Sequence, residues 1–201
     1  MPARHPRILL LNASLAGDTG NTAVLFAQAR RLLARRAHVT TLTLAATPAE
    51  IGASDFASLR PQLAAAGAFL IGTGTHWDSW SSVLQKFFED ATPAEGTALW
   101  LGKPAACVVS EHSVGGKGVL SRLQGVLVTL GCTLPPMSGL VLSRAAVIAA
   151  QHAPDAARDF WCVDDLCVVC HNLVEAAAGT HRWKTWPVDR KGFADRWLET
   201  P

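Results

Sequence analysis

Tyrosine is absent from this 201-residue sequence, long apolar segments are missing, and charged residues make up only 17% of the chain. No segment approaches the ~18 consecutive apolar residues of a membrane helix. The net charge is +2 and no dense run of Lys or Arg occurs, so nucleic-acid binding is not predicted. Because 49% of the residues are hydrophobic, we expect a globular protein. The apolar run after Arg7 is too short for a signal peptide and no membrane segment is found, so we expect the protein in the cytoplasm.

Motifs of two common enzyme classes are also missing. No Gly-x-Ser-x-Gly segment occurs, which argues against the nucleophile elbow of hydrolases. No Gly-x-Gly-x-x-Gly fingerprint follows the first apolar strand, so a Rossmann dinucleotide site is not expected. We find no internal repeat and predict a single domain over residues 1–180. The Trp-rich residues 181–201 are expected to form a tail that docks on this domain or on a partner subunit.

The five cysteines form no spaced framework, so reduced thiols in the core are expected. One stretch, Cys167-Val168-Val169-Cys170-His171, fits the C-x-x-C-H pattern of haem attachment. It lies within an expected helix over residues 158–178 that carries an apolar stripe, and no export signal is visible in the sequence. A buried helix with small apolar thiols explains the segment better than haem does, and no metal site is predicted.

Apolar strand-like segments alternate with helical patterns along the chain. The first segment, Arg7–Leu11, is an unbroken apolar run of the kind that is buried on both faces of a parallel sheet. Further strands are expected at residues 39–44, 68–72, 105–110 and 140–142. Helices are expected from Gly20 or Asn21 onward and at residues 54–66, 80–91, 117–130 and 158–178. This alternation predicts an α/β fold with a doubly wound, five-stranded parallel sheet.

A small, hydroxyl-rich loop, residues 12–22, joins the first strand to the first helix. The start of a helix leaves backbone N–H groups without partners and carries partial positive charge, so an anion can bind there. Gly17 and Gly20 permit close approach of the backbone, and Ser14, Thr19 and Thr22 add hydroxyl donors. An ordinary turn with Asp18 or Thr19 as the helix N-cap remains the alternative. The loop predicts a phosphorylated cofactor near residue 20.

A second unusual loop, residues 72–82, follows the strand that begins at Ala68. Its glycines, His76 and the nearby Trp77 and Trp80 are suited to holding a flat aromatic ring by stacking and by backbone hydrogen bonds. Ser79 or Ser81 is expected to cap the helix that follows. The alternative is that both Trp residues serve only in packing. Since ligands of doubly wound sheets bind beyond the carboxyl ends of the strands, this loop is expected beside the first one.

The third loop, residues 110–118, follows the strand that begins at Ala105. Gly115 and Gly116 permit positive φ angles and expose amide donors, which can reach a polar ring edge or a second phosphate. Lys117 adds a positive charge. A plain flexible connection is an equally good interpretation of this loop when it is taken alone.

Together, the three loops resemble those of the flavodoxin-like family, and within it the NAD(P)H-dependent FMN reductases and quinone reductases. Thr19-Gly20-Asn21-Thr22 matches the phosphate loop of flavodoxins, although the stretch before it is longer here. Gly72-Thr73-Gly74-Thr75-His76-Trp77 is similar to the second loop of the reductases. Lys103-Pro104-Ala105-Ala106 followed by Gly115-Gly116 is similar to their fourth strand and third loop. The resemblance covers residues 7–178.

The resemblance implies a flavodoxin-like fold with strand order 2-1-3-4-5 and a bound FMN, with NADPH or NADH as a transient electron donor. Because the flavin supplies the redox chemistry, no catalytic side chain is expected. The family usually has Pro and Tyr where this chain has Gly74 and His76, so Trp77 becomes the best candidate to stack on the isoalloxazine. The expected cofactor-binding residues are Ser14, Asp18, Thr19, Gly20, Asn21, Thr22, Thr73, Gly74, Thr75, His76, Trp77, Asp78, His112, Ser113, Gly115 and Gly116.

The resemblance also implies a function and an assembly. We expect an FMN-dependent NAD(P)H oxidoreductase that passes electrons to a quinone, free flavin or similar small acceptor. The alternatives are an FMN electron carrier of the flavodoxin type that serves protein partners, and a flavin-free protein that kept the fold. Flavodoxins are typically strongly acidic, so the net charge of +2 favours the reductase. A homodimer or homotetramer is expected, without nucleic-acid or membrane partners.

Overall fold

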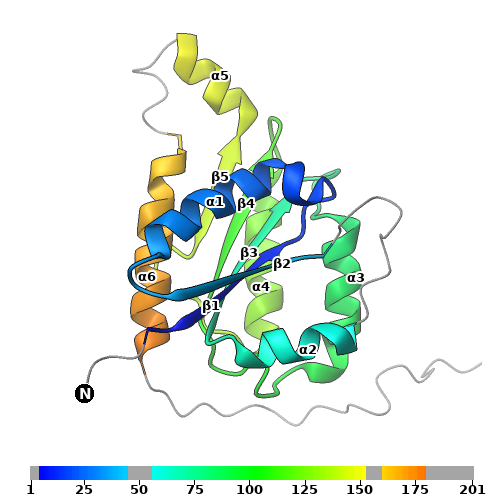
Figure 1. Ribbon diagram of the computed structural model, residues 1–201. Helices are drawn as coiled ribbons and strands as arrows, with labels where there is room; N and C mark the ends of the chain where they lie inside the picture. Colours follow the sequence, from blue (N-terminus) through cyan, green and yellow to red (C-terminus); the bar gives the residue numbers. More distant parts are fainter. Residues whose placement is uncertain (1–4, 45–55, 153–159, 180–201) are drawn as a thin grey trace, which may run out of the picture.

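The computed structural model describes residues 5–44, 56–152 and 160–179, and these form an α/β fold around one parallel sheet (Figure 1). The five strands lie in the order β2-β1-β3-β4-β5, which confirms the predicted flavodoxin-like topology. Their bounds are β1 Arg7–Asn12, β2 His38–Thr43, β3 Ala68–Gly74, β4 Ala105–Glu111 and β5 Gly139–Ser143. The expected tail, residues 181–201, lies outside the described residues.

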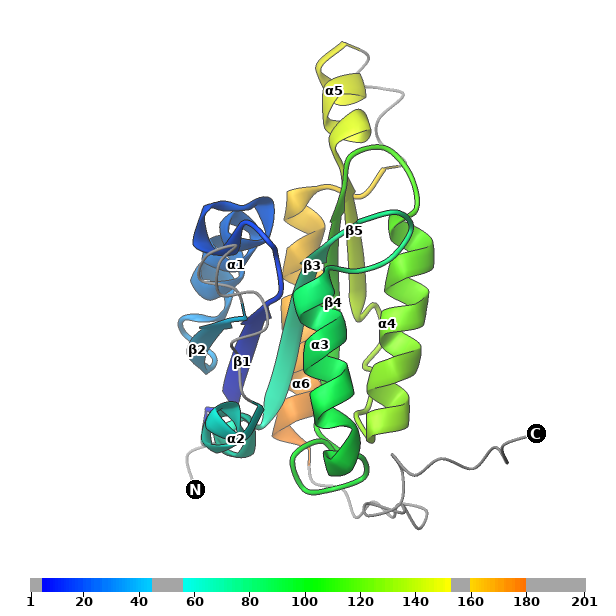
Figure 2. The same ribbon diagram turned by 90° about the vertical axis from the view of Figure 1, so that its right-hand side faces the viewer.

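Helices cover both faces of the sheet (Figures 1 and 2). On one face lie α1 (Asn21–Leu33) and α6 (Leu166–Ala178), and on the other lie α2 (Phe56–Ala65), α3 (Ser82–Ala91) and α4 (Gly116–Leu130). A further helix, α5 (Arg144–His152), continues from the end of β5 and projects beyond the sheet. Short 3-10 turns occur at η1 (Gly17–Thr19), η3 (Thr92–Ala94) and η4 (Val163–Asp165). In the described part of the chain no helix is long and apolar enough to cross a membrane.

The central strand β1 explains why both faces must be covered. Ile8 and Leu10 point into the core under α1 and α6, whereas Leu9 and Leu11 point into the core under α2, α3 and α4. All four side chains are buried because successive residues of a strand face opposite sides of the sheet. The unbroken apolar run in the sequence is therefore the signature of a strand between two helical layers.

The sequence prediction was wrong about two helical segments. The helix expected over residues 158–178 begins only at Leu166, and Phe160 and Trp161 are exposed residues before it. The chain enters this helix through η4, where the Asp165 carboxylate accepts a hydrogen bond from the Cys162 N–H at 2.8 Å. Helix α5 was not predicted. Its residues 145–150 are all apolar, and of these only Ala146 is buried.

The cysteines divide into buried and exposed thiols. Cys107, Cys132 and Cys170 are buried, whereas Cys162 and Cys167 are exposed. Burial raises the pKa of the Cys132 thiol and of the Cys170 thiol to about 12, so both stay protonated at neutral pH. In the C-x-x-C-H segment, Cys170 packs in the core beside α1 while Cys167 faces solvent. Both residues line one shallow hollow between α1 and α6, but only Cys167 is open to solvent.

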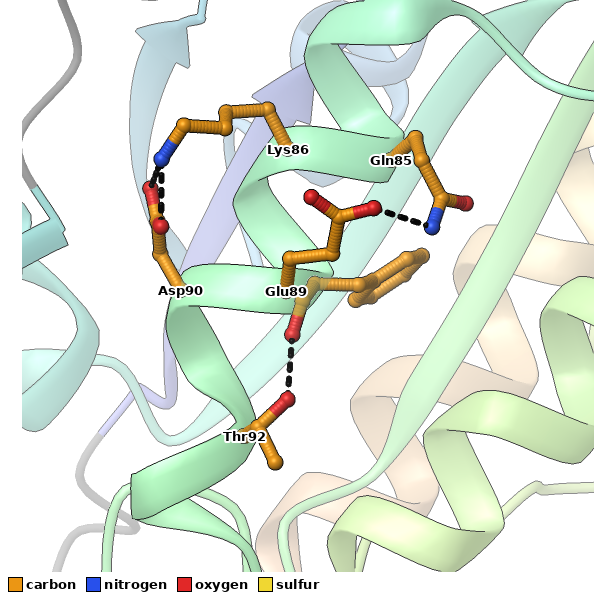
Figure 3. A network of polar contacts seen from close by, with 6 residues as sticks. Gln85, Lys86, Glu89, Asp90 and Thr92 are labelled. Carbon is orange, nitrogen blue, oxygen red and sulfur yellow. Dashed lines mark hydrogen bonds and ion pairs between the residues drawn. The ribbon is translucent and has the colours of Figure 1, made fainter. Parts of the chain in front are cut away.

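Helix α3 connects the core to the loop that precedes it. Its N-cap is Ser81, which was one of the two residues predicted for this role. The Ser81 hydroxyl accepts a hydrogen bond from the Leu84 N–H and donates one to the Ala13 carbonyl. Figure 3 shows the polar outer side of this helix, where Lys86 pairs with Asp90 and the Gln85 amide donates to Glu89 at 2.8 Å. The Thr92 hydroxyl donates to the Phe88 carbonyl and ends the helix.

Candidate functional site

An open cavity of about 460 Å³ lies at the carboxyl ends of β1, β3, β4 and β5. It spans the place where the strand order reverses between β1 and β3, which is the usual ligand position in doubly wound sheets. A larger hollow of about 830 Å³ lies beside β2 and α2, near Arg7 and His38 at the amino ends of the strands, and among the described residues no helix N-terminus lines it. The smaller cavity is lined by Ser14, Leu15, Ala16, Thr19, Gly20, Asn21, Gly74, Thr75, His76, Ser110, Glu111, His112 and Arg144.

The first wall of the cavity is the loop between β1 and α1, which is held by a buried side chain. Asn12 is the last residue of β1, and its amide donates to the Gly17 carbonyl at 3.0 Å and accepts from the Ser14 N–H at 3.1 Å. Gly17 has φ +52°, a conformation that favours glycine. The Thr19 hydroxyl donates to the Ala16 carbonyl at 2.8 Å. The loop is therefore ordered by its own hydrogen bonds before any ligand is bound.

Gly20 leads from this loop into α1 without a side-chain cap. A Cβ atom on Gly20 would lie 2.7 Å from the Ser14 hydroxyl and 2.9 Å from the Ala16 methyl group, so only glycine fits this packing. The Gly20 carbonyl accepts hydrogen bonds from the N–H groups of Ala23 and Val24. Within the described chain, the N–H groups of Asn21 and Thr22 have no partner, as expected for a helix start. An anion at this position would satisfy them.

Two predicted residues of this first loop direct their side chains elsewhere. Asp18 accepts a hydrogen bond from the Thr43 hydroxyl at 2.7 Å and so ties η1 to β2. The Thr22 side chain is buried, and its methyl group occupies the space that a Cβ atom on Gly72 would need. Thr22 can therefore offer its N–H to a ligand, while its side chain serves the contact between α1 and β3.

The second wall is formed by the end of β3 and the residues that follow it. The Thr75 N–H donates to the Ser110 carbonyl at 2.8 Å, which joins the second and third loops. The Thr75 hydroxyl oxygen is buried and has no hydrogen-bond partner among the described residues, so it is available to a ligand in the cavity. His76 also lines the cavity. Its ring lies directly against Gly74: a Cβ atom on Gly74 would be 3.4 Å from His76 Nε2.

Trp77 and Asp78 lie outside the cavity lining, at the tip of a tight turn. His76 and Ser79 close this turn with two backbone hydrogen bonds of 2.7 and 2.9 Å. Both tip residues have positive φ, as in a type I′ hairpin turn, which is strained for a Trp. The Trp77 side chain is fully exposed at 102% of its reference area. Within the described chain, His76 and not Trp77 is the ring that faces the cavity from this loop.

Two other side chains of this segment support the loop. Thr73 is buried, and its hydroxyl accepts from the Ser81 N–H at 3.2 Å. The Trp80 indole N–H donates to Gln85 at 2.9 Å, and its ring packs edge-on against Phe88. Trp80 therefore matches the packing interpretation of the sequence, and Thr73 positions the loop without lining the cavity.

The third wall comes from the end of β4 and its loop. The cavity is lined here by Ser110, Glu111 and His112. Gly115 and Gly116, which were expected at the cofactor, lie outside this lining. Gly115 has φ +94° and packs against the Asp78 carboxylate, while the Gly116 N–H donates to Glu111 at 2.5 Å. Ser113 lines a neighbouring cavity and is absent from this one. The two glycines therefore shape the loop that presents Glu111 and His112.

Arg144 is the lining residue that lies outside the three predicted loops, whereas Leu15, Ala16, Ser110 and Glu111 belong to those loops but were not among the expected cofactor-binding residues. Arg144 is the first residue of α5, directly after β5, and its guanidinium lies 3.0 Å from His112 Nε2. The Ala145 N–H also donates to the His112 carbonyl at 3.0 Å, so the start of α5 holds the third loop. The place of Arg144 in the sequence could have revealed it. A residue directly after the fifth strand of a parallel sheet lies at the same edge of the sheet as the three loops.

The geometry fits FMN, since it combines a glycine-lined helix start for a phosphate with the unpaired Thr75 hydroxyl on the neighbouring loop. A parallel sheet with this strand order, and a cavity at the carboxyl ends of its strands, defines a flavodoxin-like class of protein. Residues 6–147 match the family described as NADPH-dependent FMN reductase. The chain therefore belongs to that family, which confirms the resemblance found in the sequence.

Solved structures of low sequence identity share the fold. The complex of RosB with its bound intermediate 8-demethyl-8-formylriboflavin-5'-phosphate has 14% identity and a TM-score of 0.67, with 98% of this chain and 96% of that chain covered. The NADH:FMN oxidoreductase EMOB has 14% identity and a TM-score of 0.60, with coverages of 86% and 88%. A flavodoxin from the domain Archaea has 14% identity and a TM-score of 0.57, with coverages of 86% and 99%. No curated protein matches the sequence.

We predict that Gly20→Val lowers the affinity for FMN at least about 100-fold, because the new side chain displaces Ser14 and Ala16 and removes the phosphate contacts. Quenching of flavin fluorescence measures this affinity. Gly118→Val is the matched control, since nothing lies within 4 Å of a Cβ atom at Gly118 in α4. Equal FMN affinity in the Gly20 variant and the wild type would place the phosphate elsewhere.

We predict that Arg144→Gln weakens FMN binding about fivefold, the effect of roughly 1 kcal/mol from one partly exposed charge on the wall of the cavity. The loss should shrink at high salt, because the interaction is screened. Arg31→Gln removes the same charge from the outer side of α1, where Arg31 contacts Gln28, and should leave the affinity unchanged. Equal losses in the two variants would show that only the net charge of the protein matters.

Proposed function

We propose that this protein uses FMN to take a hydride from NADPH or NADH and passes the electrons to a quinone, free flavin or similar small acceptor. The observation that carries the proposal is the cavity itself, in which a helix start with free N–H groups lies across from the unpaired Thr75 hydroxyl after β3. With a quinone as acceptor, NAD(P)H, one proton and the quinone yield NAD(P)⁺ and the hydroquinone. Membership of the reductase family supports the same reaction type.

The residues would share the work of holding FMN. The N–H groups of Asn21 and Thr22 and the hydroxyl of Ser14 would bind the phosphate. Residues 74–76 and 110–112 would contact the isoalloxazine ring, with the Thr75 hydroxyl as a free donor. When bound, FMN supplies the hydride and electron transfer, so the protein needs no acid and base pair of its own.

Two imidazoles would orient the ligands of the cavity. His76 and His112 face it from the second and third loops, and Arg144 holds His112 through Nε2. In this contact the Nε2 atom of His112 faces the guanidinium group. The positive charge of Arg144 therefore lies on the wall of the cavity, beside the imidazole. The nicotinamide has no nucleotide-binding motif of its own in the sequence, and we infer that it binds transiently over the flavin.

The runner-up function is an FMN electron carrier of the flavodoxin type. The fold is compatible with it, because a flavodoxin is among the structures of similar fold. Two observations favour the reductase over the carrier. The family match is to reductases, and the net charge is +2 where flavodoxins are typically strongly acidic.

Mixing FMN-loaded protein with NADPH or NADH in the absence of oxygen distinguishes the two functions. We expect the visible absorbance of the flavin to disappear with at least one nucleotide and to return when a quinone is added. Protein carrying Gly20→Val should show neither change. Flavin that stays oxidised with both nucleotides would contradict the enzyme function and favour the carrier.

We also propose that the protein is a homodimer or homotetramer in which a neighbouring subunit covers the open cavity. The support is Trp77, which is fully exposed in a strained turn beside the cavity, although a large ring on a free surface is unfavourable. We predict that Trp77→Asn shifts the protein toward the monomer without lowering its melting temperature, since Asn tolerates positive φ.

Sedimentation at micromolar concentration measures this assembly. Val168→Asn, which changes an exposed apolar residue of α6, should leave the assembly intact. A wild-type monomer, or an unchanged oligomer in the Trp77 variant, would contradict the proposed interface.

A further inference from the structure

Strand β2 is a free edge of the sheet. It pairs with β1 alone, and none of its residues is buried. The N–H groups of His38 and Leu44 donate to carbonyl groups on the β1 side. Because the backbone groups of successive strand residues alternate between the two edges, those of Val39, Thr41 and Thr43, the outward amides of β2, point away from β1. Among the described residues no strand pairs with them, so β2 presents a row of open donors and acceptors.

The hollow of about 830 Å³ lies along this edge, at the amino ends of the strands. Residues 39–41 form one side of it, and the other side comes from α2 with Pro61, Gln62, Ala65 and Ala66. Arg7 also lines the hollow, and within the described chain its guanidinium makes no ion pair. An apolar and β-branched surface with a cation at its rim is suited to an indole ring. None of the functions proposed above uses this hollow.

The chain leaves α6 close to the start of β2. Arg36, two residues before β2, forms an ion pair of 2.5 Å with Glu175 of α6, and α6 ends within one further turn at Ala178. Figures 1 and 2 show the end of α6 at the same end of the sheet as α2 and the start of β1. Residues 180–201 follow, and about six extended residues match the length of β2. The C-terminal segment therefore begins beside the free edge and is long enough to cover it.

The composition of this segment favours such a contact. Three of the seven Trp residues of the chain lie in residues 180–201. Exposed indole rings are unfavourable, so the segment needs a surface that covers them. Trp183 and Trp186 are three residues apart, and in an extended segment such residues point to opposite faces. Whichever way the segment lies along β2, one of the two rings faces α2 and the hollow. Pro187 suits the outside of a sheet, since it lacks an N–H and occurs in sheets mainly on edge strands.

We propose that residues 183–188 pair with the free edge of β2 in the same chain and place one indole ring in the hollow. The chain's own segment is favoured over that of a neighbouring subunit, because it follows α6 directly, beside the start of β2. The pairing would satisfy the outward amides and would keep the strands of other molecules from adding there. The hollow lies at the amino ends of the strands and the FMN cavity at their carboxyl ends, so this contact is independent of the proposed function.

Amide hydrogen exchange of the full chain, followed residue by residue by NMR, tests the pairing. In the wild type we expect the outward amides to exchange at least about 100-fold more slowly than unstructured amides. Replacing both rings, by Trp183→Ser and Trp186→Ser, should speed their exchange at least about tenfold. The amides of Thr40 and Leu42, which face β1, should keep their rates and so report that the sheet is intact. Trp197→Ser is the matched control in the same segment and should leave all these rates unchanged.

A change in the hollow tests the same contact from the other side. Ala65 lines the hollow and is exposed, so Ala65→Trp fills the space proposed for the indole ring without disturbing the core. We expect this variant to speed the exchange of the outward amides about tenfold as well. Ala64→Trp is its matched control, since Ala64 is also exposed on α2 but lies outside the lining of the hollow. This control should keep the wild-type rates.

Several results would overturn the proposal. Fast exchange of the outward amides in the wild type would do so, and so would equal rates in the wild type and in the variant that lacks both Trp183 and Trp186. Equal effects of Ala65→Trp and Ala64→Trp would contradict the contact in the hollow. Protection that falls on dilution would assign the segment to a neighbouring subunit and contradict pairing within one chain. These measurements need neither FMN nor a nicotinamide, so their failure is distinct from a failure of the proposed function.

Discussion

The buried amide of Asn12 is the contact on which the site depends. Asn12 ends the central strand, where it is paired with Thr43 of β2 and with Gly72 of β3. Its side chain then bonds the Gly17 carbonyl and the Ser14 N–H, so the chain turns into α1 with its first N–H groups facing the cavity. A buried amide left without these partners costs about 1–3 kcal/mol, and the loop therefore has one strongly favoured shape.

Close packing at Gly72 places that loop relative to the other two. A Cβ atom at Gly72 would overlap the Thr22 methyl group and lie 2.8 Å from the Phe26 ring, so glycine lets α1 lie directly on β3. On the other face, the Ser81 hydroxyl binds the Ala13 carbonyl and draws the start of α3 to the end of β1. The Thr75 N–H then connects β3 to Ser110 of β4. Through these contacts three separate loops become one cavity, which gives the FMN chemistry of the family a defined place.

The fold could be predicted from the sequence because its strands are unbroken apolar runs, as Ile8 to Leu11 show, and because glycines and capping residues separate them from the helices. The three loops that form the site could be predicted from the sequence, but not all of the side chains that line the cavity. Trp77 is exposed because a two-residue turn closed by His76 and Ser79 directs it outward, which no local pattern reveals. Arg144 went unnoticed because no helix was predicted after the fifth strand, and its contact with His112 joins residues far apart in the chain.

A crystal structure of the FMN complex tests the central claim most directly. We predict that the FMN phosphate lies on the N–H groups of Asn21 and Thr22, with the ring between residues 74–76 and 110–112 and within reach of the Thr75 hydroxyl. A phosphate bound away from the start of α1, or a flavin in the hollow beside β2 and α2, would contradict it.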